Sequence, residues 1–266
     1  MDKLSRVLLI VEFDGHAYSG WQRQKNAYAV QQALEEAISK IEQHEVQCFG
    51  AGRTDKGVHA QAMPVHVDVS TERLLRSKRA YVHGVNQLLP LSIRVLACVQ
   101  VEDDFHARFD CLERAYCYRI WCRNTSSSLD SWRHWWMPRE LDVVQMELAS
   151  QVFMGRQDFS SVRASGCQAA SAVREIRELS LQKQGYVLEI HVRADAFLYH
   201  MVRNIVGSLV QVGLAQCSVD QLSEIMKKKD RSLSAATAPA HGLYFSDARY
   251  EKYLVSSILE NTNNDA

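Results

Sequence analysis

The sequence predicts an α+β fold made of two halves with mainly antiparallel sheets. Three observations lead to this prediction. Apolar stretches typical of strands alternate with amphipathic stretches typical of helices; residues 7–101 carry them in the order β-α-β-β-α-β, and residues 112–250 repeat that order. This is the element order of a ferredoxin-like unit. A chain of 266 residues is long enough for two such units.

The first half contains four predicted strands and two predicted helices. An apolar run at its start ends at the turn signal Asp14-Gly15. Residues 28–42 have apolar side chains at helical spacing, whereas residues 63–69 alternate between apolar and polar side chains as a strand does. The predicted strands are residues 7–13, 46–51, 63–69 and 93–101, and the predicted helices are residues 28–42 and 71–88.

The second half repeats the architecture without repeating the residues. Two of its strands are expected to form a hairpin that turns at Gln184-Gly185, and a strongly apolar helix is expected to end at Gly213. The predicted strands are residues 112–122, 173–181, 186–192 and 243–250, and the predicted helices are residues 142–153, 199–212 and 219–228.

These elements predict where the domains begin and end. We expect an N-terminal half over residues 1–104, a C-terminal half over residues 105–255, and a disordered polar tail over residues 256–266. Two α+β units with open sheets are expected to be joined around a central cleft, which is a favoured place for ligands.

Charge and cysteine content limit the class of protein. The 31 basic and 31 acidic residues give a net charge of zero, so any RNA site must be a local concentration of Arg and Lys. Seven cysteines without a CxxC pair fit a reducing compartment. No signal peptide and no apolar run of about 18 residues is found, so we expect a soluble cytoplasmic protein without membrane contact.

The segment AGRTDKGVHA, residues 51–60, is the strongest candidate for chemistry. Glycines on both sides permit a tight loop, and Asp55 lies between the cations Arg53 and Lys56. A carboxylate beside positive charge is expected to stay ionised at pH 7, which suits a nucleophile or a base. A structural aspartate that caps a helix or pairs with Arg53 explains this loop equally well.

Five segments resemble, in the same order, motifs of the tRNA pseudouridine synthase A (TruA) family. The resemblance extends from about residue 8 to residue 250, and several ordered motifs together are specific. The segments are FDG with YSGWQRQ at 13–24, AGRTDKGVHA at 51–60, DFHARF with RAYCYR at 104–119, FLYHMVRNIVG at 197–207 and ATAPAHGLY at 236–244.

This resemblance implies an isomerase that converts uridine to pseudouridine at positions 38, 39 and 40 of the tRNA anticodon arm. It implies that Asp55 is the catalytic nucleophile and that neither a cofactor nor a metal is required. Asp55 has two reasonable roles: attack on the base or the sugar, or removal of a sugar proton to give a glycal. The resemblance also implies a homodimer.

The resemblance makes Tyr116 the aromatic residue against the target base. Flipping a uracil out of its stack costs a few kcal/mol, and stacking on a ring returns about 1–3 kcal/mol. Strand alternation places Arg114, Tyr116 and Tyr118 on one face, and an Arg on that face favours a groove over a core. The competing interpretation is an aromatic residue of the core.

Two arginines complete the predicted substrate-binding set. Arg53 either pairs with Asp55 or holds phosphate and the displaced nucleotide. The resemblance favours the substrate contact, and the competing interpretation is a solvated Arg of the loop. Arg203 interrupts an apolar helix and shares a face with Val206 and Val210. A partly buried Arg requires an anion, which the resemblance identifies as the catalytic Asp and which is otherwise some structural acid.

Other basic residues are candidates for RNA contact as a group, and none is favoured individually. They are Arg23, Lys25, Arg73, Arg76, Lys78, Arg79, Arg163 and the segment 132–136.

Two competing functions follow from the same residues. One is an RNA-binding or chaperone protein that keeps the fold without catalysis, which the intact set of Asp55, Tyr116 and Arg203 argues against. The other is a metal-dependent hydrolase using Asp55 and His59. No HExxH motif and no paired Cys/His spacing supports it, so no metal site is expected.

Overall fold

The computed structural model describes residues 3–264 and consists of two compact units. Unit 1 comprises Met1–Leu112 and Phe245–Ala266, and unit 2 comprises Glu113–Tyr244. Helices are combined with mainly antiparallel strands in both units, which confirms the predicted α+β class. Within the described residues, no helix is long and apolar enough to cross a lipid bilayer.

Unit 1 has the predicted β-α-β-β-α-β order. Its strands are antiparallel in the order β4-β1-β3, with β2 paired to β3, and β10 lies next to β3. The elements are β1 (Leu4–Phe13), α1 (Val30–Glu42), β2 (Phe49–Gly50), β3 (His59–Ser70), α2 (Thr71–Arg76), α3 (Val85–Leu88), β4 (Ile93–Gln100), β10 (Leu243–Arg249) and α7 (Val255–Asn264).

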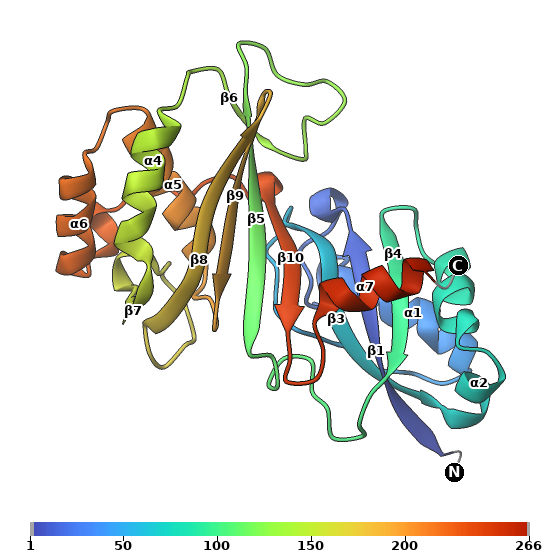
Figure 1. The fold of residues 1–266 in the computed structure, drawn as a ribbon. Coiled ribbons are helices and arrows are strands. Elements are labelled where there is room, and N and C mark those ends of the chain that lie inside the picture. Colours follow the sequence, from blue (N-terminus) through green and yellow to red (C-terminus); the bar gives the residue numbers. More distant parts are fainter. Residues whose placement is uncertain (1–2, 265–266) are drawn as a thin grey trace. The chain divides into compact units, whose positions relative to one another are not determined.

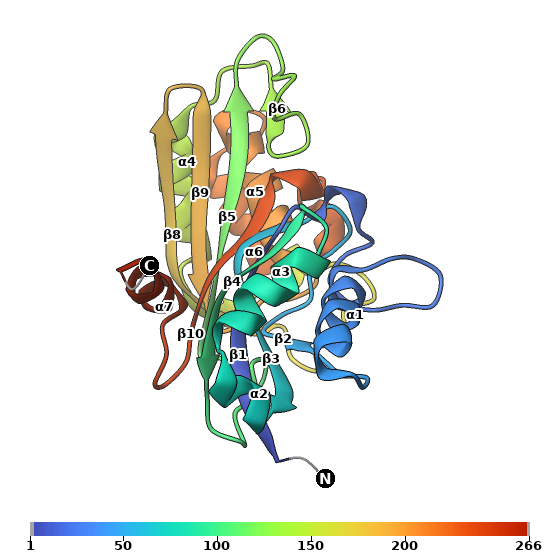
Figure 2. The ribbon, with the colours of Figure 1, turned by 90° about the vertical axis from the view of Figure 1, so that its right-hand side faces the viewer.

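The central strand of unit 1 is covered on both faces. Every side chain from Val7 to Val11 is fully buried, as expected for an apolar run with structure on either side. Figures 1 and 2 both place α1 and α7 on opposite faces of the sheet formed by β1, β3 and β4. The apolar sequence of β1 therefore reflects burial from two sides.

The predicted helix over residues 71–88 is broken. Helix α2 ends at Arg76, Ser77 is extended at φ −163°, and a π-helical turn at Ala80–Gly84 leads into α3. The side chains of residues 75–79 are all exposed, so this stretch has no apolar anchor that would hold a continuous helix against the sheet.

The predicted C-terminal tail is corrected as well. Residues up to Asn264 form α7 in place of a disordered segment, and residues 265–266 lie outside the described residues. Val255 is fully buried, with Ile258 and Leu259 half-buried on the same face. Three apolar side chains at helical spacing are enough to dock an otherwise polar segment.

The predicted domain boundary also moves. The chain leaves unit 1 after Leu112 instead of after residue 104, and it returns to unit 1 at Phe245 instead of staying in the second half. The reason is tertiary: the hydroxyl of Tyr250 donates to the carbonyl of Ala107 at 2.7 Å, and the amide of Leu112 donates to Arg249 at 2.9 Å.

Unit 2 contains strands in the order β5-β9-β8-β7, all antiparallel, with β6 parallel to β5. Helices α4, α5 and α6 lie on one face of this sheet (Figures 1 and 2). The short strands β6 and β7 are absent from the sequence prediction. The elements are β5 (Glu113–Cys122), β6 (Trp135–Met137), α4 (Val143–Ser150), β7 (Gly155–Asp158), β8 (Val173–Gln184), β9 (Val187–Ala194), α5 (Met201–Gly213) and α6 (Val219–Lys228).

Candidate functional site

The four predicted site residues are divided between the two units. Arg53 and Asp55 lie on the loop between β2 and β3 in unit 1, whereas Tyr116 on β5 and Arg203 on α5 belong to unit 2. Each unit therefore supplies its own part of the predicted set.

Asp55 occupies the first position of a tight turn. Its carbonyl accepts a hydrogen bond from the amide of Val58 at 3.1 Å, and Gly57 has a φ of 81°. A positive φ at the third position is the requirement of a type II turn, which Gly meets without strain. The Asp55 side chain is half-buried, and Arg53 and Lys56 on either side of it are exposed.

Residues 13–21, here called the opening segment, contain two glycines that allow their backbone to approach this loop closely. A Cβ on Gly20 would lie 2.5 Å from the Thr54 carbonyl oxygen, and one on Gly15 would lie 1.9 Å from that of Val58. The amide of Trp21 donates to the same Thr54 oxygen at 3.1 Å. The segment 13–21 therefore backs the Asp55 loop along its length, which gives a physical reason for two of the sequence motifs.

His59 fastens the opening segment to the start of β3. Its imidazole is 2% exposed, and Nδ1 accepts a hydrogen bond from the amide of Gly15 at 3.1 Å. The same nitrogen lies 3.2 Å from a carboxylate oxygen of Asp14. His59 thus supports the loop, and its Nδ1 is engaged in that support.

Thr54, next to Asp55, carries a buried hydroxyl. Among the described residues its Oγ1 has no hydrogen-bond partner. A buried polar group left unpaired costs about 1–3 kcal/mol, so it calls for an explanation such as strain or a catalytic role.

In unit 2, the side chain of Tyr116 is almost completely buried. The side chain is 8% exposed, and its ring meets that of Phe197 edge-on, with centroids 5.1 Å apart and planes at 88°. Two positions along the strand, the hydroxyl of Tyr118 donates to the carbonyl of Pro239 at 2.8 Å. Strand alternation alone does not reveal this contact between Tyr116 and Phe197, since Phe197 lies in a distant segment of the chain.

Arg203 lies in the first turn of α5 and is half-buried. Its Nε donates to the carbonyl of Ala238 at 2.8 Å, and the amide of Ala238 donates back to the Arg203 carbonyl at 3.2 Å. One turn later, a Cβ on Gly207 would lie 2.2 Å from the carbonyl oxygen of Ala236. Close packing at Gly207 therefore holds the segment 236–239 against the helix that carries Arg203.

Tyr118 lies close to the Arg203 guanidinium. Burial raises the pKa of the Tyr118 phenol well above its usual range, and the positive charge of Arg203 acts in the opposite direction. The motifs at 114–119, 197–207 and 236–244 thus meet within unit 2.

A pocket of about 250 Å³ lies beside the Asp55 loop in unit 1. Gly52 and Arg53 line it from the loop, and His106, Arg108 and Phe109 line it from the segment DFHARF at 104–109. The sequence links this segment to the family by resemblance alone and gives it no role. The sequence signal for this lining is an Arg close to His and Phe residues in one short segment.

The other basic candidates fall into two groups. Arg23 and Lys25 line a second hollow of about 660 Å³ with Tyr28, and Arg23 also pairs with Glu35 at 3.0 Å. Others are engaged within the fold: the guanidiniums of Arg73 and Arg163 donate to backbone carbonyls, and Arg76 pairs with Glu72.

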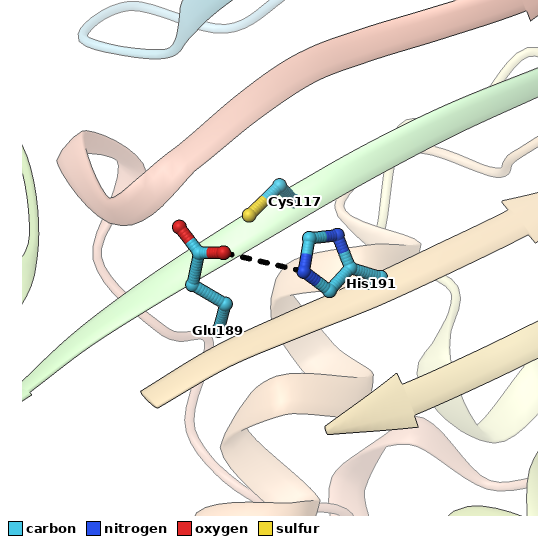
Figure 3. Close-up of side chains that lie close together, drawn as sticks. All are labelled: Cys117, Glu189 and His191. Carbon is cyan, nitrogen blue, oxygen red and sulfur yellow. Dashed lines mark ion pairs between the residues drawn. The ribbon is translucent and has the colours of Figure 1, made fainter. Parts of the chain in front are cut away.

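Among residues 3–264, one group of side chains could offer three ligands to a metal ion. It consists of Cys117 on β5 with Glu189 and His191 on β9, whose ligand atoms lie within 4.8 Å of one another (Figure 3). His191 Nε2 is 3.3 Å from one Glu189 oxygen, and Arg119 Nε donates to the other at 2.8 Å.

The protonation and pairing of this group favour an ion-pair cluster. Burial, together with the charge of Glu189, raises the pKa of the Cys117 thiol to about 12, so the thiol is protonated at pH 7. Both Glu189 oxygens already face a partner. A metal ion would have to displace the Arg119 guanidinium and deprotonate the thiol.

The chain is similar in sequence to known proteins. The profile of the family described as "tRNA pseudouridine synthase" matches residues 9–110 and 149–251. Proteins named "tRNA pseudouridine synthase A" are similar over nearly the whole chain. The one from Hydrogenovibrio crunogenus is 44% identical over 240 residues, covering 90% of each chain.

Two further relatives carry the same name. The one from Rhodospirillum centenum is 44% identical over 247 residues, covering 93% of this chain and all of the relative. That from Francisella tularensis subsp. novicida is 42% identical over 250 residues, covering 94% and 96%. A solved structure, "Crystal Structure of a Cbf5-Nop10-Gar1 Complex", covers 76% of this chain and 54% of its own at 11% identity, with a TM-score of 0.33 that is too low to support an inference.

Proposed function

The chain belongs to the tRNA pseudouridine synthase family, and from this premise we propose that it isomerises uridines at positions 38, 39 and 40 of the tRNA anticodon stem-loop. The family match shows that the chain is an isomerase acting on tRNA. So do three relatives at 42–44% identity, of which 90–100% of the length is covered. The proposal concerns the modified tRNA positions, the role of Asp55 as the nucleophile and the flipping of the target base.

The observation that carries the proposal is the way in which the Asp55 loop is held. The carboxylate is half-buried in a type II turn, and Gly15 and Gly20 bring the opening segment into contact with that turn. A reactive group gains rate from a fixed position, because misplacement by about 1 Å can cost about a hundredfold. A merely structural aspartate would not need support from two sides.

The reaction requires one bond to break and another to form. The C1′–N1 glycosidic bond breaks, uracil rotates, and C5 bonds to C1′; N1 takes a proton and the hydrogen on C5 is lost to solvent. In one route Asp55 attacks C1′ or the base and is later displaced. In the other it removes the C2′ proton to give a glycal and returns it after the new bond forms.

Base flipping and the remaining site residues belong to the same proposal. Tyr116 is assigned to stack against the flipped uracil, which offsets part of a cost of a few kcal/mol. Arg53 is exposed on the loop and is assigned to the displaced nucleotide, and Arg203 is assigned to the catalytic anion. The seven cysteines are free thiols, and we assign the enzyme to the cytoplasm, where such thiols persist.

Site mapping on tRNA transcripts tests this proposal. Transcripts with uridine at position 38, 39 or 40 are incubated with the protein, and pseudouridine is located by chemical derivatisation followed by reverse transcription. We expect stops at those positions and at no other. A stop pattern confined to another arm of the tRNA would contradict the assigned positions, and no pseudouridine at all would contradict the activity.

A further inference from the structure

We propose that the pocket of about 250 Å³ beside the Asp55 loop is a second nucleotide site. Its occupant would be an unpaired nucleotide of the RNA substrate adjacent to the target uridine. This inference rests on the proposed function, since it names a further contact of the same substrate.

The pocket exposes aromatic rings. Phe109 is 75% exposed and Phe49 is 37% exposed, although large apolar side chains ordinarily avoid water. Both rings lie against His106, with centroid distances of 4.3 Å and 5.5 Å. Exposed rings are the stacking platforms of proteins that bind single-stranded nucleic acid, and one stacked base strengthens binding by about 5- to 150-fold.

The charge of the pocket matches a phosphate. Arg53 and Arg108 line it, and none of the described lining residues is acidic. Burial lowers the pKa of His106 below its usual value, so at pH 7 the positive charge comes from the two arginines. A planar base on the rings and a phosphate on the guanidiniums together describe a nucleotide.

The position of the pocket favours a neighbour of the target. Arg53 lies two residues before Asp55, and two residues of chain span at most about 7 Å. The pocket is slightly smaller than the roughly 300–1,000 Å³ of sites for drug-sized ligands, so it suits one base and not a stacked pair. A nucleotide bound there would be adjacent to the one at Asp55.

The aromatic floor of the pocket is built in advance. Phe49 on β2 pairs with His66 on β3, and their rings stack with centroids 4.9 Å apart at 11°. His66 Nδ1 in turn accepts a hydrogen bond from the amide of Ala107 at 3.0 Å. Because these contacts order the platform before RNA arrives, binding loses less conformational entropy.

Phe109→Ala tests the proposal, with Phe109→Trp and Leu91→Ala as matched variants. Leu91 is an exposed apolar residue of the same unit that does not line the pocket. The RNA is an anticodon stem-loop with 2-aminopurine beside the target uridine, whose fluorescence falls on stacking. Fluorescence titration gives Kd, and tritium release from C5-labelled uridine gives KM and kcat.

We expect Phe109→Ala to abolish the quenching and to raise Kd and KM about tenfold, with a smaller effect on kcat. Phe109→Trp should restore both, and Leu91→Ala should behave as the unaltered protein. Arg108→Gln should reduce the slope of log Kd against log salt by about 1. Quenching and Kd unchanged in Phe109→Ala would overturn the proposal.

The two proposals fail separately. If the unaltered protein quenches 2-aminopurine through Phe109 but releases no tritium, the nucleotide site stands and the proposed function fails. If tritium is released equally by the unaltered protein and by Phe109→Ala at low RNA concentration, the function stands and the nucleotide site fails.

Discussion

The backbone on both sides of Asp55 is held by hydrogen bonds. The turn to Val58, the amide of Trp21 on Thr54 and the imidazole of His59 on Gly15 each hold a neighbour of the carboxylate. The sequence identifies Asp55 as a candidate because Gly, Arg and Lys surround it. Gly15 and Trp21 belong to a segment 34–40 residues before Asp55, so spacing within the loop does not reveal their contribution.

His66 makes the stability of unit 1 depend on pH. Burial lowers its pKa from 6.5 to about 4, and the nearby His106 adds to the effect. The folded protein therefore holds His66 neutral, whereas the unfolded chain binds a proton below about pH 6.5. This contribution to stability is complete above pH 6.5 and is lost as pH falls from 6.5 to about 4.

Comparison with His66→Gln isolates that contribution, because the amide oxygen can still accept the hydrogen bond from Ala107. Urea unfolding at pH 7 and at pH 4.5 should show the unaltered protein losing about 2 kcal/mol more than the variant. Equal losses in the two proteins would mean that His66 titrates in the folded state as it does in the unfolded chain.

At the scale of elements, the opening segment packs against the Asp55 loop at two glycines, Gly15 and Gly20. Gly20→Ala should destabilise the protein by at least about 2 kcal/mol, because φ is 89° and the new Cβ would lie 2.5 Å from the Thr54 carbonyl oxygen. Its rate of tritium release should also fall under conditions in which the variant is still folded, since the clash displaces the loop that carries Asp55.

Gly84→Ala is the control for this substitution. The backbone there is helical at φ −65°, and the nearest contact of a new Cβ is the Ile41 Cδ1 atom at 3.4 Å. Its free energy of unfolding should rise by about 0.4–1 kcal/mol or stay unchanged. Thermal unfolding and tritium release measure both variants, and a fully active, fully stable Gly20→Ala would contradict this account of the loop.

Elements with local signals are predictable from the sequence, and those fixed by tertiary contacts are not. Helix α6 coincides with its prediction because Ser218 and Gln221 form a capping box and Lys229 ends the helix in the left-handed region. Helix α7 and the break after Arg76 escape prediction. The first depends on docking of Val255 in unit 1, and the second on a lack of buried anchors.

At the scale of the whole molecule, the chain crosses between its units twice. Hydrophobic periodicity predicts the element order of the first half, and that of the second half apart from the short strands β6 and β7. The return of the chain to unit 1 at Phe245 depends instead on contacts such as that of Tyr250 with Ala107. For the same reason, the sequence places Asp55 on a loop but does not reveal the pocket formed with His106 and Phe109.

The homodimer remains a prediction from the resemblance to the family. Light scattering at micromolar protein concentration should give twice the 30.3 kDa of one chain. A mass of one chain across that concentration range would contradict it. Since the net charge is zero, charge repulsion between copies does not oppose pairing at pH 7.

The most direct test of the central claim is tritium release from tRNA carrying C5-tritiated uridine, in the presence of a metal chelator. The unaltered protein should release tritium under single-turnover conditions. Asp55→Asn should release none above background while its Kd for tRNA stays within about threefold, and Asp103→Asn, which changes an exposed carboxylate of the same unit, should match the unaltered protein. Release by Asp55→Asn at the unaltered rate would contradict the assignment of Asp55 to the chemistry.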